Sequence, residues 1–186
     1  FLAKFRSLSR QFLKVFMSLI LTVNGTSKAD QNAPELNQLF DRLKFAESAP
    51  AARIIEEEIW KVWFKTPGKD SEEKLSIALK NVQQGKLSAA LKLVSEIIVA
   101  DPQYAEAWNQ RAIIKFLVGD LEGSLDDVDQ ALALEPRHFG ALSGRGQCLL
   151  RLRRYGEALT AYRKASIINP QNHSIRNYVF LLEGQV

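Results

Sequence analysis

The polar residues that could carry out chemistry in this chain lie in short stretches, and none has the spacing that a reaction needs. Asp126, Asp127 and Asp129 are close enough in sequence to suggest a cation site. The pattern around them is helical, however, and side chains at these spacings leave a helix in different directions, so the three carboxylates cannot all converge on one ion. We therefore expect them to lie on a solvated outer face.

The remaining chemistry-bearing residues favour no site either. His138 and His173 are expected in loops, and no cysteine or further histidine lies at ligand spacing to either one. The glycine-rich run 140–146 follows no predicted strand, so it does not indicate a phosphate-binding loop. Cys148 is the single cysteine and has apolar neighbours, which favours a small buried side chain. We expect no catalytic residue, no metal and no cofactor.

The excess of positive charge lies at the start of the chain. The sequence has 25 basic and 21 acidic residues, but residues 1–29 hold five of the basic ones and no acid, which leaves 20 basic against 21 acidic residues in the remainder. A body with this balance has no basic face large enough to neutralise a run of phosphates. Binding to nucleic acid is therefore not expected.

Residues 1–29 have the order of regions that is typical of a secretory signal peptide. A basic stretch to Lys14 precedes the apolar run 15–23, and the small residues Ser27 and Ala29 follow. A run of nine residues would span about 14 Å as a helix, roughly half of the hydrocarbon core, so a stable membrane span is not expected. The pattern predicts cleavage after Ala29 and export to a bacterial periplasm.

The same segment is compatible with two further roles. It can be an amphipathic helix that stays on a cytosolic or membrane-associated protein. Its arginine pattern also resembles a twin-arginine signal, but Arg10 stands alone there, which favours the general secretory route. Since the sequence begins with Phe1, the true start of the protein can lie upstream.

The rest of the chain contains a 34-residue repeat. Asp, Glu or Asn followed by proline recurs at 101–102, 135–136 and 169–170. When the units are aligned, small residues share their eighth and twentieth positions. Small side chains at these positions allow two antiparallel helices to pack closely. The eighth positions are Ala78, Ala112 and Gly146, and the twentieth are Ala90, Ser124 and Ala158.

These columns resemble the tetratricopeptide repeat (TPR), with Trp108 at the family's tryptophan position. The resemblance implies an all-α solenoid of helix-turn-helix units over 71–172, in repeats 71–104, 105–138 and 139–172. This sequence departs from the family pattern at four positions. Arg111 and Arg145 occupy a seventh position that is usually apolar, Arg153 replaces a turn glycine, and Ile97 replaces a small residue.

Helical periodicity extends on both sides of the repeats. Residues 34–46 and 50–65 each carry an apolar stripe, and the register continues back to Gly68, so 30–70 is predicted to be a degenerate repeat that caps the stack. Its Trp60, Trp63 and Phe64 are expected in the core. Residues 173–186 are predicted to form a C-terminal capping helix.

The resemblance implies a scaffold that binds a peptide or protein partner in a concave groove lined by the first helix of each repeat. The lining implied here is mixed, apolar with a few amides, and lacks the basic set that clamps a C-terminal carboxylate. The groove residues carried over from the family are Leu75, Leu79, Glu106, Asn109, Gln110, Ile113, Phe116, Gly140, Ser143, Gly144, Gln147 and Arg151.

In the third repeat, Gly140, Ser143 and Gly144 are smaller than usual groove residues, although glycine inside a helix costs about 1 kcal/mol relative to alanine. Two hypotheses account for this. Gly140 can lie at the helix start while Gly144 accommodates a neighbour such as Phe116, or the three can open a notch for a partner.

The sequence features discriminate among three functions. The run 136–144 resembles short exported TPR proteins of alphaproteobacteria, which favours a periplasmic adaptor. A three-repeat cytosolic chaperone of type III secretion would lack the export signal. A helical-solenoid lytic transglycosylase would need a lysozyme-like domain, for which no residues are left. The identity of the partner is not predicted.

Overall fold

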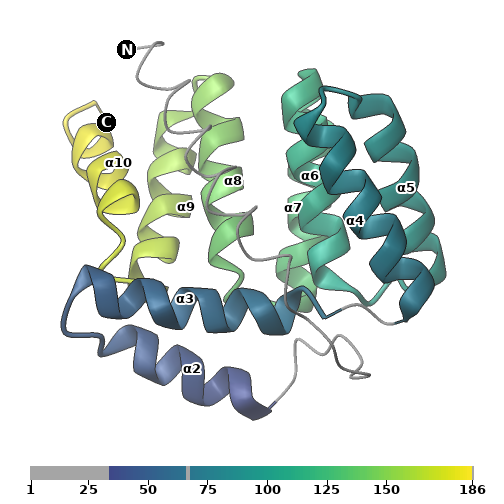
Figure 1. The fold of residues 1–186 in the computed structure, drawn as a ribbon. Coiled ribbons are helices and arrows are strands. Elements are labelled where there is room, and N and C mark those ends of the chain that lie inside the picture. The colour runs from purple at the N-terminus through teal and green to yellow at the C-terminus, as the bar shows by residue number, and fades with distance from the viewer. Residues whose placement is uncertain (1–33, 66–67, 186) are drawn as a thin grey trace.

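A computed structural model describes residues 34–65 and 68–185 of the chain (Figure 1). These residues form nine α-helices and no strand. The helices are α2 (Pro34–Lys44), α3 (Ala49–Trp63), α4 (Lys69–Gln83), α5 (Leu87–Ala100), α6 (Ala105–Val118), α7 (Leu121–Leu134), α8 (Phe139–Arg151), α9 (Tyr155–Ile168) and α10 (His173–Glu183).

Helices α4 to α9 form three antiparallel pairs, which confirms the predicted all-α solenoid (Figure 1). The second helices begin at Leu87, Leu121 and Tyr155, 34 residues apart. The small residues predicted between paired helices are all buried. At Gly146 the reason is direct, because a Cβ atom there would lie 2.6 Å from the ring of Tyr162.

The turns between paired helices use the left-handed backbone conformation. Gly85 and Gly119 have φ angles of +73° and +90°. Arg153 takes the same place in the third pair, with φ of +60°. An L-residue with a side chain pays a steric penalty in this conformation that glycine avoids. The third turn is therefore strained where the sequence departs from the repeat pattern.

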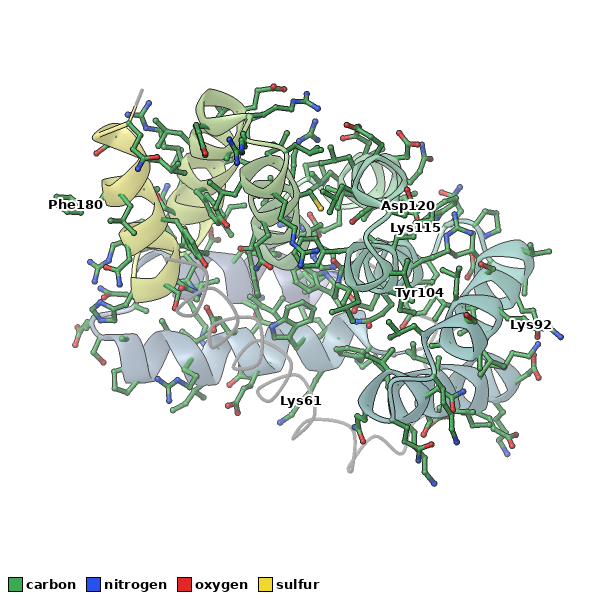
Figure 2. The ribbon with its side chains drawn as sticks, turned by 90° about the horizontal axis from the view of Figure 1, so that it is seen from above. Lys61, Lys92, Tyr104, Lys115, Asp120 and Phe180 are labelled. Atoms are coloured by element: carbon green, nitrogen blue, oxygen red, sulfur yellow. The ribbon has the colours of Figure 1, made fainter. Side chains whose placement is uncertain are left out.

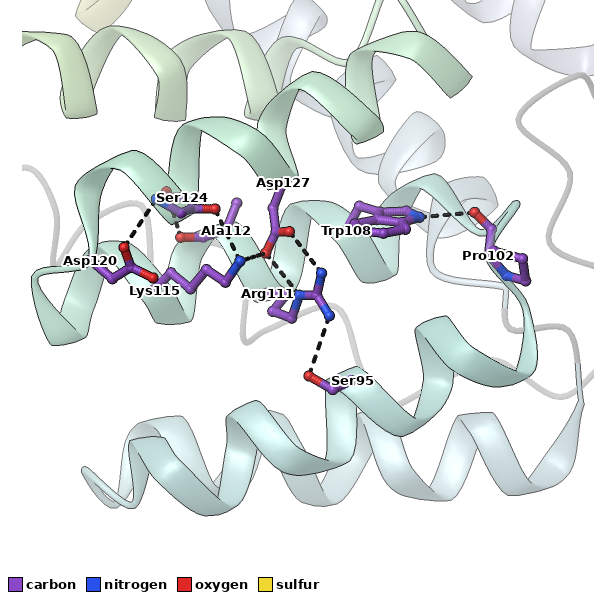
Figure 3. A network of polar contacts seen from close by, with 10 residues as sticks. Ser95, Pro102, Trp108, Arg111, Ala112, Lys115, Asp120, Ser124 and Asp127 are labelled. Carbon is purple, nitrogen blue, oxygen red and sulfur yellow. Dashed lines mark hydrogen bonds and ion pairs between the residues drawn. The ribbon is translucent and has the colours of Figure 1, made fainter.

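The expectation that Asp126, Asp127 and Asp129 share a solvated face is wrong for Asp127, which is 3% exposed. Its carboxylate accepts two hydrogen bonds of 2.8 Å from Arg111 and pairs with Lys115 at 2.9 Å (Figure 3). The arginine in the usually apolar seventh position thus has its counter-charge sixteen residues later. Asp126 and Asp129 are exposed as expected.

Helices α2 and α3 form a hairpin that does not stack in front of α4 as a degenerate repeat would. The hairpin lies across one end of the third pair (Figure 1). Gln171 donates a hydrogen bond to the Ala46 carbonyl, and Arg137 donates one of 2.7 Å to Asn37. The predicted extra repeat is therefore wrong in its placement, since contacts to distant loops override the repeat register.

Helix α10 follows the last pair and packs against α9 with Ile175 and Leu182. The rings of Tyr178 and Tyr162 stack at 4.6 Å. On the opposite side Phe180 is exposed and points away from the body of the molecule (Figure 2). Among the described helices, none combines the length and apolar character needed to cross a membrane.

Candidate functional site: the first-helix face

The first helices of the three pairs, α4, α6 and α8, carry all twelve residues predicted to bind a partner, and we call the surface formed by these residues the first-helix face. The structure divides it into two halves. Six residues in the middle of α4 and the first turns of α6 and α8 are buried, whereas six residues nearer the helix ends are accessible to varying degrees. The buried half consists of Leu75, Glu106, Asn109, Gln110, Gly140 and Ser143, and the open half of Leu79, Ile113, Phe116, Gly144, Gln147 and Arg151.

The polar centre of the buried half is the carboxylate of Glu106, which is 1% exposed. Asn109 and Gln110, one turn along the same helix, both donate side-chain amide hydrogen bonds to it. A buried carboxylate needs such donors, because it has lost its hydration. These three predicted groove residues therefore satisfy one another and are not available to a ligand.

His138 completes this network, which the sequence did not indicate. It was expected in a loop, but it is fully buried and caps the start of α8, where its Nδ1 accepts the Ala141 N–H at 3.2 Å. Since Nδ1 accepts, Nε2 carries the proton and donates to Glu106 at 2.9 Å. His138 therefore links α8 to α6. Its position just before a helix was compatible with capping, but no motif marks the pairing.

The hairpin closes the buried half with two tryptophans of α3. The Trp63 ring stacks on His138 with centroids 4.1 Å apart, and Trp60 meets His138 and Phe139 edge to face. A Cβ atom at Gly140 would lie 2.6 Å from the Trp60 ring. The notch proposed at Gly140 therefore exists, but a side chain of the same chain fills it. The expectation that both tryptophans belong to the core is confirmed.

The open half has a different character. Phe116 lies under the Arg151 guanidinium, which is 4.3 Å from the ring centroid and also donates to the Phe116 carbonyl at 3.1 Å. A Cβ atom at Gly144 would meet no described atom within 4 Å. One of the two hypotheses was that Gly144 makes room for a neighbouring side chain such as Phe116. The open space at this position argues against that hypothesis. The missing side chain of Gly144 leaves open space in the accessible half of the face.

The described residues give no sign of a catalytic or metal centre. No group of three or more potential ligands among them could hold a metal ion. Burial raises the pKa of the Cys148 thiol, and although a hydrogen bond to Ser124 acts in the opposite direction, the thiol is kept in its unreactive form. Burial likewise raises the pKa of Tyr104, and the nearby Glu106 adds to the effect.

Comparison with known proteins identifies the fold family. A family model described as tetratricopeptide repeat matches residues 111–173. A TPR repeat-containing protein of Rhizobium etli is 33% identical over 159 residues, which make up 86% of this chain and 76% of the relative. The chain belongs to the tetratricopeptide-repeat family. The resemblance read from the 34-residue period is thereby confirmed.

Solved TPR domains have the same fold at low sequence identity. The first TPR of Spaghetti (RPAP3) bound to an HSP90 peptide superimposes with a TM-score of 0.60 at 22% identity, covering 62% of this TPR chain and 92% of that domain. The Yersinia enterocolitica type III secretion chaperone SycD, in complex with a peptide of the translocator YopD, gives 0.59 at 14% identity and covers 63% and 96%.

Proposed function

We propose that this TPR protein is a non-enzymatic scaffold that binds a segment of a protein partner on the open half of the first-helix face. One observation carries the proposal: Gly144 leaves a space on a face whose other half the chain has filled itself. Two of its structural neighbours were solved with peptides, one from HSP90 and one from YopD. Their ligands support a peptide-sized partner for the present chain.

The chemistry of the open half favours a segment with one apolar side chain next to an acceptor. Ile113 and Phe116 of α6 are partly exposed in the open half and offer apolar contact. Arg151, already held over an aromatic ring, can donate to a carboxylate or a carbonyl oxygen. Neighbouring helix axes lie about 8–10 Å apart, so three first helices span roughly 20 Å, or about six residues of extended chain.

We further propose that the protein works in a bacterial periplasm. The support is the order of basic, apolar and small residues in 1–29, which lies outside the described residues. The alternative is a cytosolic chaperone of the type III secretion kind, which the likeness to SycD keeps open. Sequencing the N-terminus of protein from cell fractions separates them. A periplasmic chain that begins near Asp30 is expected, and a cytosolic chain that retains residues 1–29 would reject the periplasmic assignment.

Site-specific photocrosslinking in living cells tests the binding site. A photoreactive residue at Phe116 is expected to capture a discrete partner, because this position is partly exposed in the open half. The matched control places the same residue at Asp126, which is exposed on α7. The same product from both positions, or none from Phe116, would reject the open half as the binding site.

A further inference from the structure

The α2–α3 hairpin has the properties of a docked unit. Its apolar cluster is built from its own side chains, joined from the repeats by the buried Phe139. Its other links to the repeats include apolar contact with Ile168 of α9 and the hydrogen bonds of Gln171 with Ala46 and of Arg137 with Asn37. The hairpin therefore has a cluster largely of its own and meets the repeats through a limited set of contacts.

Helix α3 provides most of that surface from one stripe. Glu56, Trp60 and Trp63 follow one another at i, i+4 and i+7, the spacing of residues on one side of a helix. Lys61, just after Trp60, is exposed and points away from the repeats (Figure 2). Amphipathic helices that bind grooves use the same spacing for their anchoring side chains.

Each of the three side chains has a defined contact site on the repeats, and we call these sites the α3 seats. Trp60 fills the space over Gly140, and Trp63 stacks on His138. The Glu56 carboxylate accepts hydrogen bonds from the side-chain amides of Asn169 and Asn172, the latter at 3.3 Å, in the loop before α10. The seats belong to the third pair and its exit loop, so α3 is bound as a helical ligand would be.

Two features weaken this docking. The indole N–H of Trp63 is buried and has no hydrogen-bond acceptor among the described residues, which is unfavourable because the group has lost its hydrogen bond to water. Burial raises the pKa of Glu56 to about 7, despite opposing contributions from Asn172 and Arg53, so the ionised carboxylate is held unfavourably. Both penalties disappear when the hairpin leaves.

We propose that the hairpin is an intramolecular competitor: α3 covers Gly140 and His138 with Trp60 and Trp63 and binds the loop before α10 with Glu56, and a partner helix with the same three side chains can replace it. This inference rests on the proposed function, because it regulates the same face. With the hairpin docked, only the open half is available to a partner. With the hairpin displaced, the seats of the third pair accept a helical segment as well.

A labelled synthetic peptide of residues 49–64 tests the proposal as a probe of the α3 seats. Its affinity is measured by fluorescence anisotropy for the chain and for the double variant Trp60→Ala/Trp63→Ala, which weakens the competitor and leaves the seats intact. Removing an occupant that is docked nine-tenths of the time strengthens apparent binding about tenfold. We expect at least this gain, and expect it to vanish when the peptide's tryptophans are replaced by alanine.

A Gly140→Leu substitution added to the double variant is a matched control on the receptor side. It fills the Trp60 seat and is expected to abolish the gain in peptide binding. Equal binding of the peptide to the original chain and to a folded double variant would overturn the proposal. So would the absence of binding to both.

Hydrogen exchange on the unaltered chain decides the question if the double variant does not fold. An undocked hairpin of two short helices is marginally stable, so amides of α2 and α3 should exchange together and faster than those of α6 to α9. Exchange of all these amides at one common rate would overturn the proposal. Crosslinking at Phe116 does not require hairpin release, so failure of the proposed function is seen separately.

Discussion

The three repeats and the hairpin are both built from antiparallel helix pairs, but they obtain their positions in different ways. In the repeats, small residues such as Ala112 and Gly146 fix how closely helices pack, and the 34-residue period passes this geometry to the next pair. The hairpin does not follow the 34-residue period. Its position is determined by contacts with residues about 80 to 120 positions later in the sequence. A regular stack can therefore carry an irregular element that covers part of its own binding face.

The largest loss of stability is expected when a buried charge in the repeats is removed. Asp127→Leu should destabilise the fold by about 3–5 kcal/mol, because it leaves Arg111 and Lys115 without their buried counter-charge. Asp126→Leu, on the exposed side of the same helix, should change stability by less than about 0.5 kcal/mol. Urea denaturation of both variants measures the difference, and equal stabilities would contradict the buried ion pair.

The hairpin should make stability depend on pH through Glu56. The pKa of Glu56 is about 7 in the folded chain, against an ordinary value of 4.5. The folded state binds this proton more tightly, so the stabilisation is full below about pH 4.5 and is lost as pH rises through about 7. Each pKa unit corresponds to about 1.4 kcal/mol, which makes a change of up to roughly 3 kcal/mol.

Glu56→Gln isolates this effect, because the amide keeps an acceptor oxygen and cannot ionise. The variant and the original chain should have similar stability near pH 4.5, and the variant should be more stable at pH 8. Thermal denaturation across this range measures both. Parallel curves for the two proteins would show that Glu56 titrates normally.

A substitution at Ala112 tests the packing between the helices of a repeat. Ala112→Leu should destabilise the chain by roughly 1–3 kcal/mol, since Ala112 is buried between α6 and α7 beside Val128 and Ala131. Ala133→Leu on the exposed side of α7 is the control for helix propensity. An unchanged melting temperature for Ala112→Leu would mean that the repeat register is misplaced.

The smallest expected effect concerns the strained turn. Arg153→Gly should stabilise the chain by up to about 1 kcal/mol, because glycine adopts a φ of +60° without the steric penalty. Gly119→Ala should have the opposite sign, since its φ is +90°. Chemical denaturation measures the free energy of unfolding. A lower value for Arg153→Gly than for the original chain would indicate that the arginine side chain has a stabilising contact.

The sequence predicted the structural features that follow from the 34-residue period. It did not predict the features that depend on contacts between distant segments. The buried small residues and the αL turn at Arg153 follow from aligned columns, so they were within reach of sequence reasoning. The burial of Asp127 also had a signal, because Arg111 in an apolar column required an acid nearby. No pattern relates Trp60 to Gly140 or His138 to Glu106, since each contact depends on how distant segments meet. The division of the first-helix face therefore needed the structure.

Gly144→Leu tests most directly whether the open half of the first-helix face binds the partner. Since no described atom lies within 4 Å of a Cβ atom at this position, the variant should melt at the same temperature as the original chain or higher. Its leucine should fill the open space at this position and abolish photocrosslinking of the partner from Phe116. A variant that melts lower and still captures the partner would contradict the account.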